Sequence, residues 1–142
     1  MSDQKIVQKI VLAGIILYKK KVLILQRNGN EDIFPGIWEL PSGKKKPLEI
    51  PLKALLREVK EETGLDVKMI MPTSFFSYQI KKNNEIWDSV QINCLVKPIN
   101  KKNKVRLSSE HQKFVWVGTK NISNYKLSNL TKKAIKQVFA LI

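Results

Sequence analysis

Short apolar runs separated by turn residues dominate the first third of the chain. Residues 6–17 are rich in Ile, Val and Leu, and residues 22–25 form a second apolar run after a lysine cluster. This arrangement predicts two strands joined by a polar turn. The Asn, Gly, Asp and Pro residues at 28–35 favour a loop, and residues 37–40 predict a brief strand after it.

The pattern changes to a helical period after Pro51. Apolar residues then recur at i, i+3, i+4 and i+7, namely Leu52, Leu55, Leu56 and Val59. The pattern stops at Thr63-Gly64. Proline suits a first helical turn and glycine suits the residue after a helix, so the sequence predicts one amphipathic helix between them.

The second half of the chain alternates strand-like stretches with polar turns. Strands are predicted at 67–70, 75–80, 86–96 and 114–117, with a polar hairpin turn before the third. A final amphipathic helix is indicated by apolar residues at helical spacing: Leu127, Leu130, Ala134, Ile135, Val138 and Leu141. Hairpins mixed with crossovers predict a single domain, residues 1–142, of the mixed α+β type of α/β fold, with helices covering a mixed sheet.

The composition supports one globular domain. A chain of 142 residues with 43% hydrophobic residues is long enough for one core and too apolar for global disorder. The longest apolar run, residues 10–17, is too short to span a membrane, so no membrane partner is expected. One cysteine, Cys94, forms neither an internal disulfide nor a multi-thiolate metal site. We therefore expect a cytoplasmic protein.

The net charge of +14 raises the question of a polyanionic partner. Only Arg27, Arg57 and Arg106 are arginines, and the lysines form short scattered groups without interleaved aromatic residues. A solvated lysine-rich surface is therefore favoured. Nucleic acid is disfavoured as a partner without being excluded, and the sequence leaves a homodimer open.

Three carboxylates share one face of the predicted helix. Glu58, Glu61 and Glu62 fall within one arc of about 100° on a helical projection. Like charges at these spacings repel, which suggests that a cation binds there. Oxygen ligands suit a hard cation such as Mg²⁺, with Mn²⁺ as an alternative, and Mg²⁺ favours phosphoryl chemistry. A solvated acidic face paired with Lys53, Arg57 and Lys60 is the alternative interpretation.

The spacing around this helix forms an extended motif. Residues 43–65 read GKKKPLEIPLKALLREVKEETGL. This segment resembles the Nudix box, G-x5-E-x7-R-E-U-x-E-E-x-G-U with U aliphatic, and fills every specified position. The stretches VLILQR, FPGIWELPSG and EHQKFVWV are also similar to MutT-type Nudix proteins. The resemblance implies a Nudix-type α/β/α sandwich with the mixed sheet between helices.

The resemblance assigns roles to the motif residues. It implies that Glu58, Glu61 and Glu62 hold one or more Mg²⁺ ions, with the Gly43 carbonyl as a further ligand. Glu49 and Arg57 would pair to fix the loop against the helix, a geometric clamp on the metal ligands.

The family often draws one more acidic residue from a later loop, as a metal ligand or as the general base. Glu110 matches that position, and a plain exposed loop glutamate is its alternative interpretation. For the general base, the sequence does not choose between Glu61 and Glu110.

The activity implied is metal-dependent hydrolysis of a nucleoside diphosphate linked to another group. A nucleoside triphosphate, including an oxidised one, hydrolysed to the monophosphate and pyrophosphate is the leading substrate. ADP-ribose, a dinucleoside polyphosphate and the 5′ end of RNA are the other enzymatic alternatives. A non-catalytic Nudix-like nucleotide sensor or RNA-binding module is the alternative from another functional class.

Substrate contacts are predicted outside the motif. Arg27 matches an arginine that contacts phosphates in MutT-like proteins, with a surface arginine as the alternative. Trp38, Phe76 and Trp87 are candidate base contacts. Trp38 and Phe76 could stack on a base, although large aromatic residues in strands belong more often to the core. Asn129 would either contact a base edge or cap the last helix, and capping is favoured.

The loop before the helix departs from the common family pattern. Many members have Gly, Glu and Gly where this chain has Ser42, Lys46 and Leu48. None of these is a specified motif position. The changes put three lysines beside the expected site, where they would attract phosphates or simply reflect the lysine-rich composition.

Overall fold

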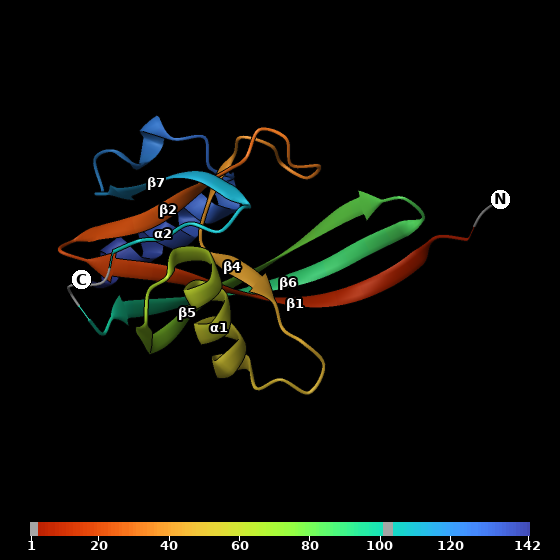
Figure 1. Cartoon of the computed structure of the whole chain (residues 1–142), viewed down its shortest axis with the longest axis horizontal. Coiled ribbons are helices and arrows are strands. Elements are labelled where there is room, and N and C mark those ends of the chain that lie inside the picture. The colour runs from red at the N-terminus through yellow and green to blue at the C-terminus, as the bar shows by residue number, and fades with distance from the viewer. Residues whose placement is uncertain (1–2, 101–103) are drawn as a thin grey trace.

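The computed structural model describes residues 3–100 and 104–142, in which two helices enclose one mixed sheet (Figure 1). The elements in chain order are β1 (Lys5–Tyr18), β2 (Lys21–Arg27), β3 (Trp38–Glu39), β4 (Ser42–Lys44), α1 (Pro51–Thr63), β5 (Val67–Lys82), β6 (Glu85–Pro98), β7 (His111–Val117), a short 3-10 helix (Ile122–Asn124) and α2 (Asn129–Leu141).

The central strand of the sheet is β1. The strand order is β3-β2-β1-β6-β5, with β4 paired to β1 and β7 paired to β2. The β1–β6 pair is parallel and runs from Lys5↔Glu85 to Ile16↔Val96, whereas the other pairs are antiparallel. Figure 1 shows the N-terminal half of β1 and the β5–β6 hairpin projecting beyond the helices.

Alternation along β1 divides the core into two layers. Ala13, Ile15 and Leu17 face the layer that packs on α2, whereas Leu12 and Ile16 face the layer that packs on α1. Because successive strand residues point to opposite faces, a strand buried on both sides reads as one continuous apolar run. The predicted helix–sheet–helix sandwich is confirmed.

The strand at residues 67–82 corrects a prediction. The sequence predicted separate strands at 67–70 and 75–80, but β5 is one strand with register shifts between Met69 and Met71 and between Pro72 and Ser74. Bulges allow an edge strand to continue past a proline, which lacks an amide donor. Strand β7 also begins earlier than predicted, at His111.

The helix ends follow the sequence signals, with one exception. Helix α1 begins at Pro51 and ends before Gly64, which has φ 74° and donates its amide to the Lys60 carbonyl at 2.9 Å. The predicted cap of the last helix was wrong by one residue. Ser128 is the cap and accepts a hydrogen bond from the Thr131 amide at 3.1 Å.

Gly14 allows α1 to pack closely on β1. A Cβ atom at Gly14 would lie 2.9 Å from Val59 Cγ2 on α1. We predict that Gly14→Ala lowers the free energy of unfolding by about 1–3 kcal/mol, because a β-branched core residue cannot move aside freely. Urea denaturation measures this loss.

Gly118→Ala is the matched control, since a Cβ there would meet no atom within 4 Å. Equal stabilities of the two variants would contradict the close packing of α1 on β1.

Candidate active site

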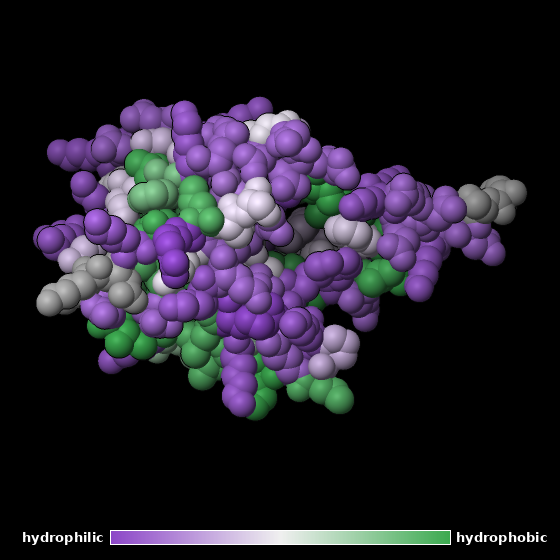
Figure 2. All heavy atoms as spheres, in the orientation of Figure 1, coloured by the Kyte–Doolittle hydropathy of each residue, from purple (hydrophilic) through white to green (hydrophobic). Residues whose placement is uncertain are grey.

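A large cleft opens between the rounded body and the projecting strands. Its volume is about 830 Å³, and its walls come from β1, the β3–β4 region, β5, β6, α1 and the start of α2. Figure 2 shows this hollow with mainly hydrophilic side chains around its rim. Two motif carboxylates, Glu58 and Glu62, line this cleft together with the aromatic residues proposed from the sequence.

Arg57 holds the motif loop against α1. Its Nε and Nη2 donate to the two Glu49 carboxylate oxygens at 2.8 and 2.9 Å, and Nη2 also donates to the Lys44 carbonyl at 3.1 Å. Nη1 donates to Glu58 at 2.7 Å and to Glu61 at 3.3 Å. The pair expected between Glu49 and Arg57 is therefore present, and the guanidinium is fully used within its own loop and helix.

The ion pair sets the charge state of both partners. The Arg57 guanidinium, with help from the Lys46 amide, lowers the pKa of Glu49 to about 2. Hydrogen bonding to Glu49 raises the pKa of Arg57 above its already high usual value. Both groups are therefore charged at neutral pH, and the clamp does not titrate in that range.

Gly43 is required by the position of Glu58. A Cβ atom at Gly43 would lie 2.0 Å from the Glu58 carboxyl group, so only glycine fits there without a shift of Glu58. Burial raises the pKa of Glu58, and the Arg57 contact opposes that rise. The motif glycine therefore sets the distance between β4 and the acidic face of α1.

Glu62 is a buried carboxyl group with few donors. It is 5% exposed, and its Oε1 accepts a hydrogen bond from the Ser42 amide at 2.8 Å. Burial, together with the nearby charges of Glu39, Glu110 and Glu58, raises its pKa to about 9, against the opposing effect of the Ser42 hydrogen bond. A cation at this point would reverse the effect, because it stabilises the charged carboxylate.

Glu110 and His111 complete a group of metal-ligating side chains with Glu62. One ligand atom from each of the three lies within 4.8 Å of the others. His111 is buried, its Nε2 lies 2.8 Å from a Glu39 oxygen, and its Nδ1 has no hydrogen-bond partner among the described residues.

A carboxylate accepts hydrogen bonds, so Glu39 favours the proton on Nε2 of the neutral His111 ring. The free lone pair then lies on Nδ1. A histidine oriented by a carboxylate in this way is typical of metal sites, and these residues fit a divalent cation.

Glu61 lies apart from this group. Its side chain is 55% exposed, interacts with Arg57 and does not line the cleft. Of the four ligands implied by the motif, Glu58, Glu62 and Gly43 line the cleft and Glu61 does not. Its roles as metal ligand and as general base stay predictions.

The predicted substrate residues are distributed unevenly. Trp38 and Phe76 line the cleft, and Trp38 also packs edge-on against Tyr125 with ring centroids 5.1 Å apart. Arg27 lines the cleft too, but its guanidinium binds Glu39 at 3.1 Å. Asn129 is exposed and lies outside the lining, although its neighbours Ser128 and Leu130 belong to it.

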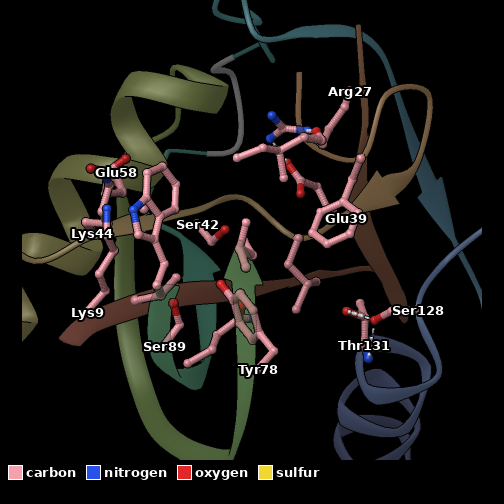
Figure 3. Close-up of a pocket in the computed structure, with 18 of the residues that line it drawn as sticks. Lys9, Arg27, Glu39, Ser42, Lys44, Glu58, Tyr78, Ser89, Ser128 and Thr131 are labelled. Carbon is pink, nitrogen blue, oxygen red and sulfur yellow. Dashed lines mark hydrogen bonds and ion pairs between the residues drawn. The ribbon is translucent and has the colours of Figure 1, made fainter. Parts of the chain in front are cut away.

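Sequence reasoning missed the polar floor of the cleft. Tyr78 on β5 and Ser89 and Gln91 on β6 line it, as Figure 3 shows for Tyr78 and Ser89. Burial raises the pKa of Tyr78, which stays protonated at neutral pH. The missed signal was the alternation in residues 86–96, which places Ser89 and Gln91 on one face of a strand whose other face is apolar from Val90 onward. Glu39 and His111 carried no comparable signal.

A family model described as the NUDIX domain matches residues 9–138 of the chain. The chain belongs to the NUDIX family. The predicted family and enzyme class, a Nudix hydrolase, are thereby confirmed, and a divalent metal is the cofactor that such hydrolases generally use.

Curated relatives and solved structures agree with this assignment. Nucleoside triphosphatase NudI of Escherichia coli O1:K1 / APEC is 25% identical over 137 residues, covering 91% of this chain and 95% of that protein. The solution structure of the E. coli ORF135 protein is 26% identical with a TM-score of 0.68, covering 97% of this chain and 91% of that one. The MutT protein of Methanosarcina mazei Go1 shares the fold, with 24% identity, a TM-score of 0.75, and coverage of 99% and 97%.

Within residues 3–100 and 104–142, neither helix has the length and apolar character needed to cross a membrane.

The Glu49–Arg57 pair predicts an acid-dependent loss of stability. Glu49 has a folded-state pKa below its usual value near 4.3. The contribution of ionised Glu49 to the free energy of unfolding is therefore complete above about pH 5, and it disappears as the pH falls toward 2. We expect Glu49→Gln to unfold at lower urea concentration than wild type at pH 6, and the difference to shrink across this acid range.

Asp66→Asn serves as the control because it breaks an exposed ion pair. The side chains of Lys60 and Asp66 are 49% and 56% exposed, respectively. Its effect should stay below about 1 kcal/mol. A Glu49→Gln difference that is independent of pH would contradict the assigned charge state.

Leu48 predicts a stabilising substitution in the motif loop. It is fully exposed and has φ 64°, a conformation that costs a residue with a Cβ about 1–2 kcal/mol. Glycine removes that strain. Its greater conformational entropy in the unfolded state, however, lowers the stability by about 0.5–1 kcal/mol. We expect Leu48→Gly to gain about 0.5 kcal/mol in urea denaturation, whereas Leu48→Ala should gain nothing. A gain by the alanine variant would show that strain is not the cause.

Proposed function

We propose that the protein hydrolyses a nucleoside triphosphate to the monophosphate and pyrophosphate with the help of a divalent cation. The observation that carries this proposal is the buried Glu62 carboxyl group, which shares a cleft with Glu58 and Glu110 and has an oxygen within 4.8 Å of a His111 ring nitrogen. A buried carboxyl group such as Glu62, which has no ion pair among the described residues, suits a site completed by a metal and a phosphate-bearing ligand.

The residues that would hold the cation are Glu58, Glu62 and the Gly43 carbonyl, with His111 as an additional nitrogen donor. A bound Mg²⁺ or Mn²⁺ would neutralise charge on the diphosphate and polarise the phosphoryl group under attack. Arg57 keeps Glu58 in position, and the Ser42 amide orients Glu62. The chain thus fixes its ligands before substrate binds, which lowers the reorganisation needed for catalysis.

Glu110 is our choice for the general base. It lines the cleft, whereas Glu61 is held by Arg57 and lies outside the lining. In the proposed step, a water oxygen bonds to one phosphorus of the diphosphate and Glu110 takes the water proton. The bond from that phosphorus to the bridging oxygen breaks, and the leaving phosphate group keeps the electron pair.

The opposite wall of the cleft supports a nucleoside as the bound group. Trp38, Phe76 and Leu130 offer apolar surface, and Thr131 offers a hydroxyl group near the start of α2. A flat base can stack on such a wall. The curated relatives named nucleoside triphosphatase make the triphosphate our first choice among Nudix substrates.

A nucleotide panel tests this proposal. We expect release of pyrophosphate from one or more nucleoside triphosphates in the presence of Mg²⁺, and no release after chelation. The panel includes oxidised triphosphates, ADP-ribose, a dinucleoside polyphosphate and a 5′-triphosphorylated RNA. Turnover of any of the last three in preference to all triphosphates would overturn the substrate assignment, and no turnover of any member would overturn the catalytic one.

We predict that Glu62→Gln weakens metal binding without impairing folding. The amide oxygen can still accept the Ser42 hydrogen bond, and a neutral group is easier to bury than a charge. We expect the metal-free variant to melt at or above the wild-type temperature. Adding Mg²⁺ should raise the wild-type melting temperature but not that of the variant, because only a folded-state ligand stabilises.

Hydrolysis should also fall at least 100-fold in Glu62→Gln. Asp66→Asn, an exposed change beyond the C-terminal end of α1, should keep both the Mg²⁺ response and the activity. An unchanged Mg²⁺ response in Glu62→Gln would remove this residue from the metal site.

A further inference from the structure

Three lysines surround a single indole ring beside one end of the cleft. The Nζ atoms of Lys9, Lys44 and Lys82 lie 3.5, 5.1 and 5.3 Å from the ring centroid of Trp87. We call these four residues the lysine–tryptophan cluster. Lys9, Lys44 and Trp87 line the cleft, and Figure 3 shows Lys9 and Lys44 on the same side as Glu58.

Strand register holds the cluster together. Lys9 on β1 pairs with Ser89, two positions from Trp87 on β6, and Lys82 on β5 pairs with Glu85, two positions to the other side. Residues two apart on a strand share a face, so both lysines lie diagonally next to the indole. Lys44 joins them from β4, which pairs with β1 at Val11. Paired strands therefore set the positions from which all three lysines extend.

Attraction to the ring does not account for three lysines. The face of an indole stabilises a cation by about 0.5–2 kcal/mol, and Lys9 already occupies the closest position. Lys44 and Lys82 then add like charge within about one Debye length. Burial, followed by the neighbouring Lys44 ammonium group, lowers the pKa of Lys9 to about 8.

Opposite charge is scarce around the cluster. In the described part of the chain, no carboxylate lies within 4.0 Å of the three ammonium groups. Glu85 is the acidic neighbour on the hairpin, and it accepts the Trp87 Nε1 hydrogen bond at 3.1 Å. The three lysines therefore have no ion-pair partner among the described residues, which concentrates positive charge at this end of the cleft.

We infer that the lysine–tryptophan cluster binds the terminal phosphate groups of the substrate and thereby selects nucleoside triphosphates over nucleoside diphosphates linked to an uncharged sugar. This inference rests on the proposed function and adds a specificity determinant outside the Nudix motif, since only Lys44 belongs to the motif loop.

The layout of the cleft gives the substrate a direction. The apolar wall at Trp38 and Phe76 suits the base, the carboxyl groups of Glu58 and Glu62 suit the hydrolysed diphosphate, and the cluster follows on the side of Glu58. An uncharged sugar at that end would leave the three ammonium groups uncompensated. A phosphate would offer several acceptor oxygens to them, and charge-assisted hydrogen bonds are the stronger kind.

Substrate discrimination tests the inference. For wild type, Lys9→Met and Lys82→Ala, kcat/KM is measured with a nucleoside triphosphate and with the diphosphate sugar of the same base. We expect each variant to lower the preference for the triphosphate about tenfold, mainly through KM, as expected for one lost charge-assisted contact. Lys9→Met keeps an apolar stem over the indole, so folding is preserved.

Lys81→Ala is the matched control. It removes the same charge from the same hairpin, but its side chain points to the other face of β5. Its preference should equal that of wild type. A preference unchanged in both Lys9→Met and Lys82→Ala, with triphosphates still hydrolysed, would overturn the inference and leave the proposed function intact.

A binding measurement separates the inference from catalysis. Calorimetric titration with inorganic tripolyphosphate in metal-free buffer should give about tenfold weaker binding to Lys9→Met and Lys82→Ala than to wild type and Lys81→Ala. Equal affinities of all four proteins would overturn the inference. If wild type hydrolyses no nucleotide but the affinities still differ in this way, the proposed function fails and the anion site stands.

Discussion

The five donors of one guanidinium organise the acidic half of the cleft. Arg57 joins Glu49, the Lys44 carbonyl and Glu58, and thereby fixes the loop that carries Gly43 to the helix that carries Glu62. Its planar fork matches a carboxylate in two places at once, which lysine cannot do. With the loop in this position, the Ser42 amide reaches Glu62, and Gly43 contacts Glu58. The rest of the site depends on this single side chain.

Apart from the ion pairs of Arg27 and Arg57, the cleft keeps its acidic and basic groups separate. Buried carboxyl groups lie in the middle and lysines lie at one end, so each group is held near its own kind. Such an arrangement lowers stability, and proteins tolerate it where binding or catalysis requires it. A phosphate chain with its metal would supply the missing charge to both groups.

The helices were more predictable than the details of the sheet. The boundaries of α1 follow from local rules, because Pro51 and Gly64 act on their own turns of backbone. The bulges in β5 depend on the partner strand. The sequence around Pro72 indicated a gap between two strands, whereas the structure pairs both parts with β6 as one strand. The cap at Ser128 was missed because Ser and Asn are adjacent and both cap helices well.

The motif likewise located only part of the site. The acidic residues on α1 were predictable from spacing, but Glu110 rested on family resemblance, and His111 was not predicted as part of the site. Its buried position depends on β7 pairing with β2 and on Glu39 beside it. Sequence spacing carries information about one helix, whereas contacts between distant strands arise only from the tertiary fold.

The parallel pairing of β1 with β6 also constrains how the chain folds. It joins the N-terminal strand to one in the second half of the chain, and such non-local pairings slow folding. The group of metal-ligating side chains is equally non-local, since Glu62 meets Glu110 and His111 only after β7 has joined β2. A chain still emerging from the ribosome therefore carries the glutamates of α1 without the assembled group, and gains it only when synthesis has passed the last strand.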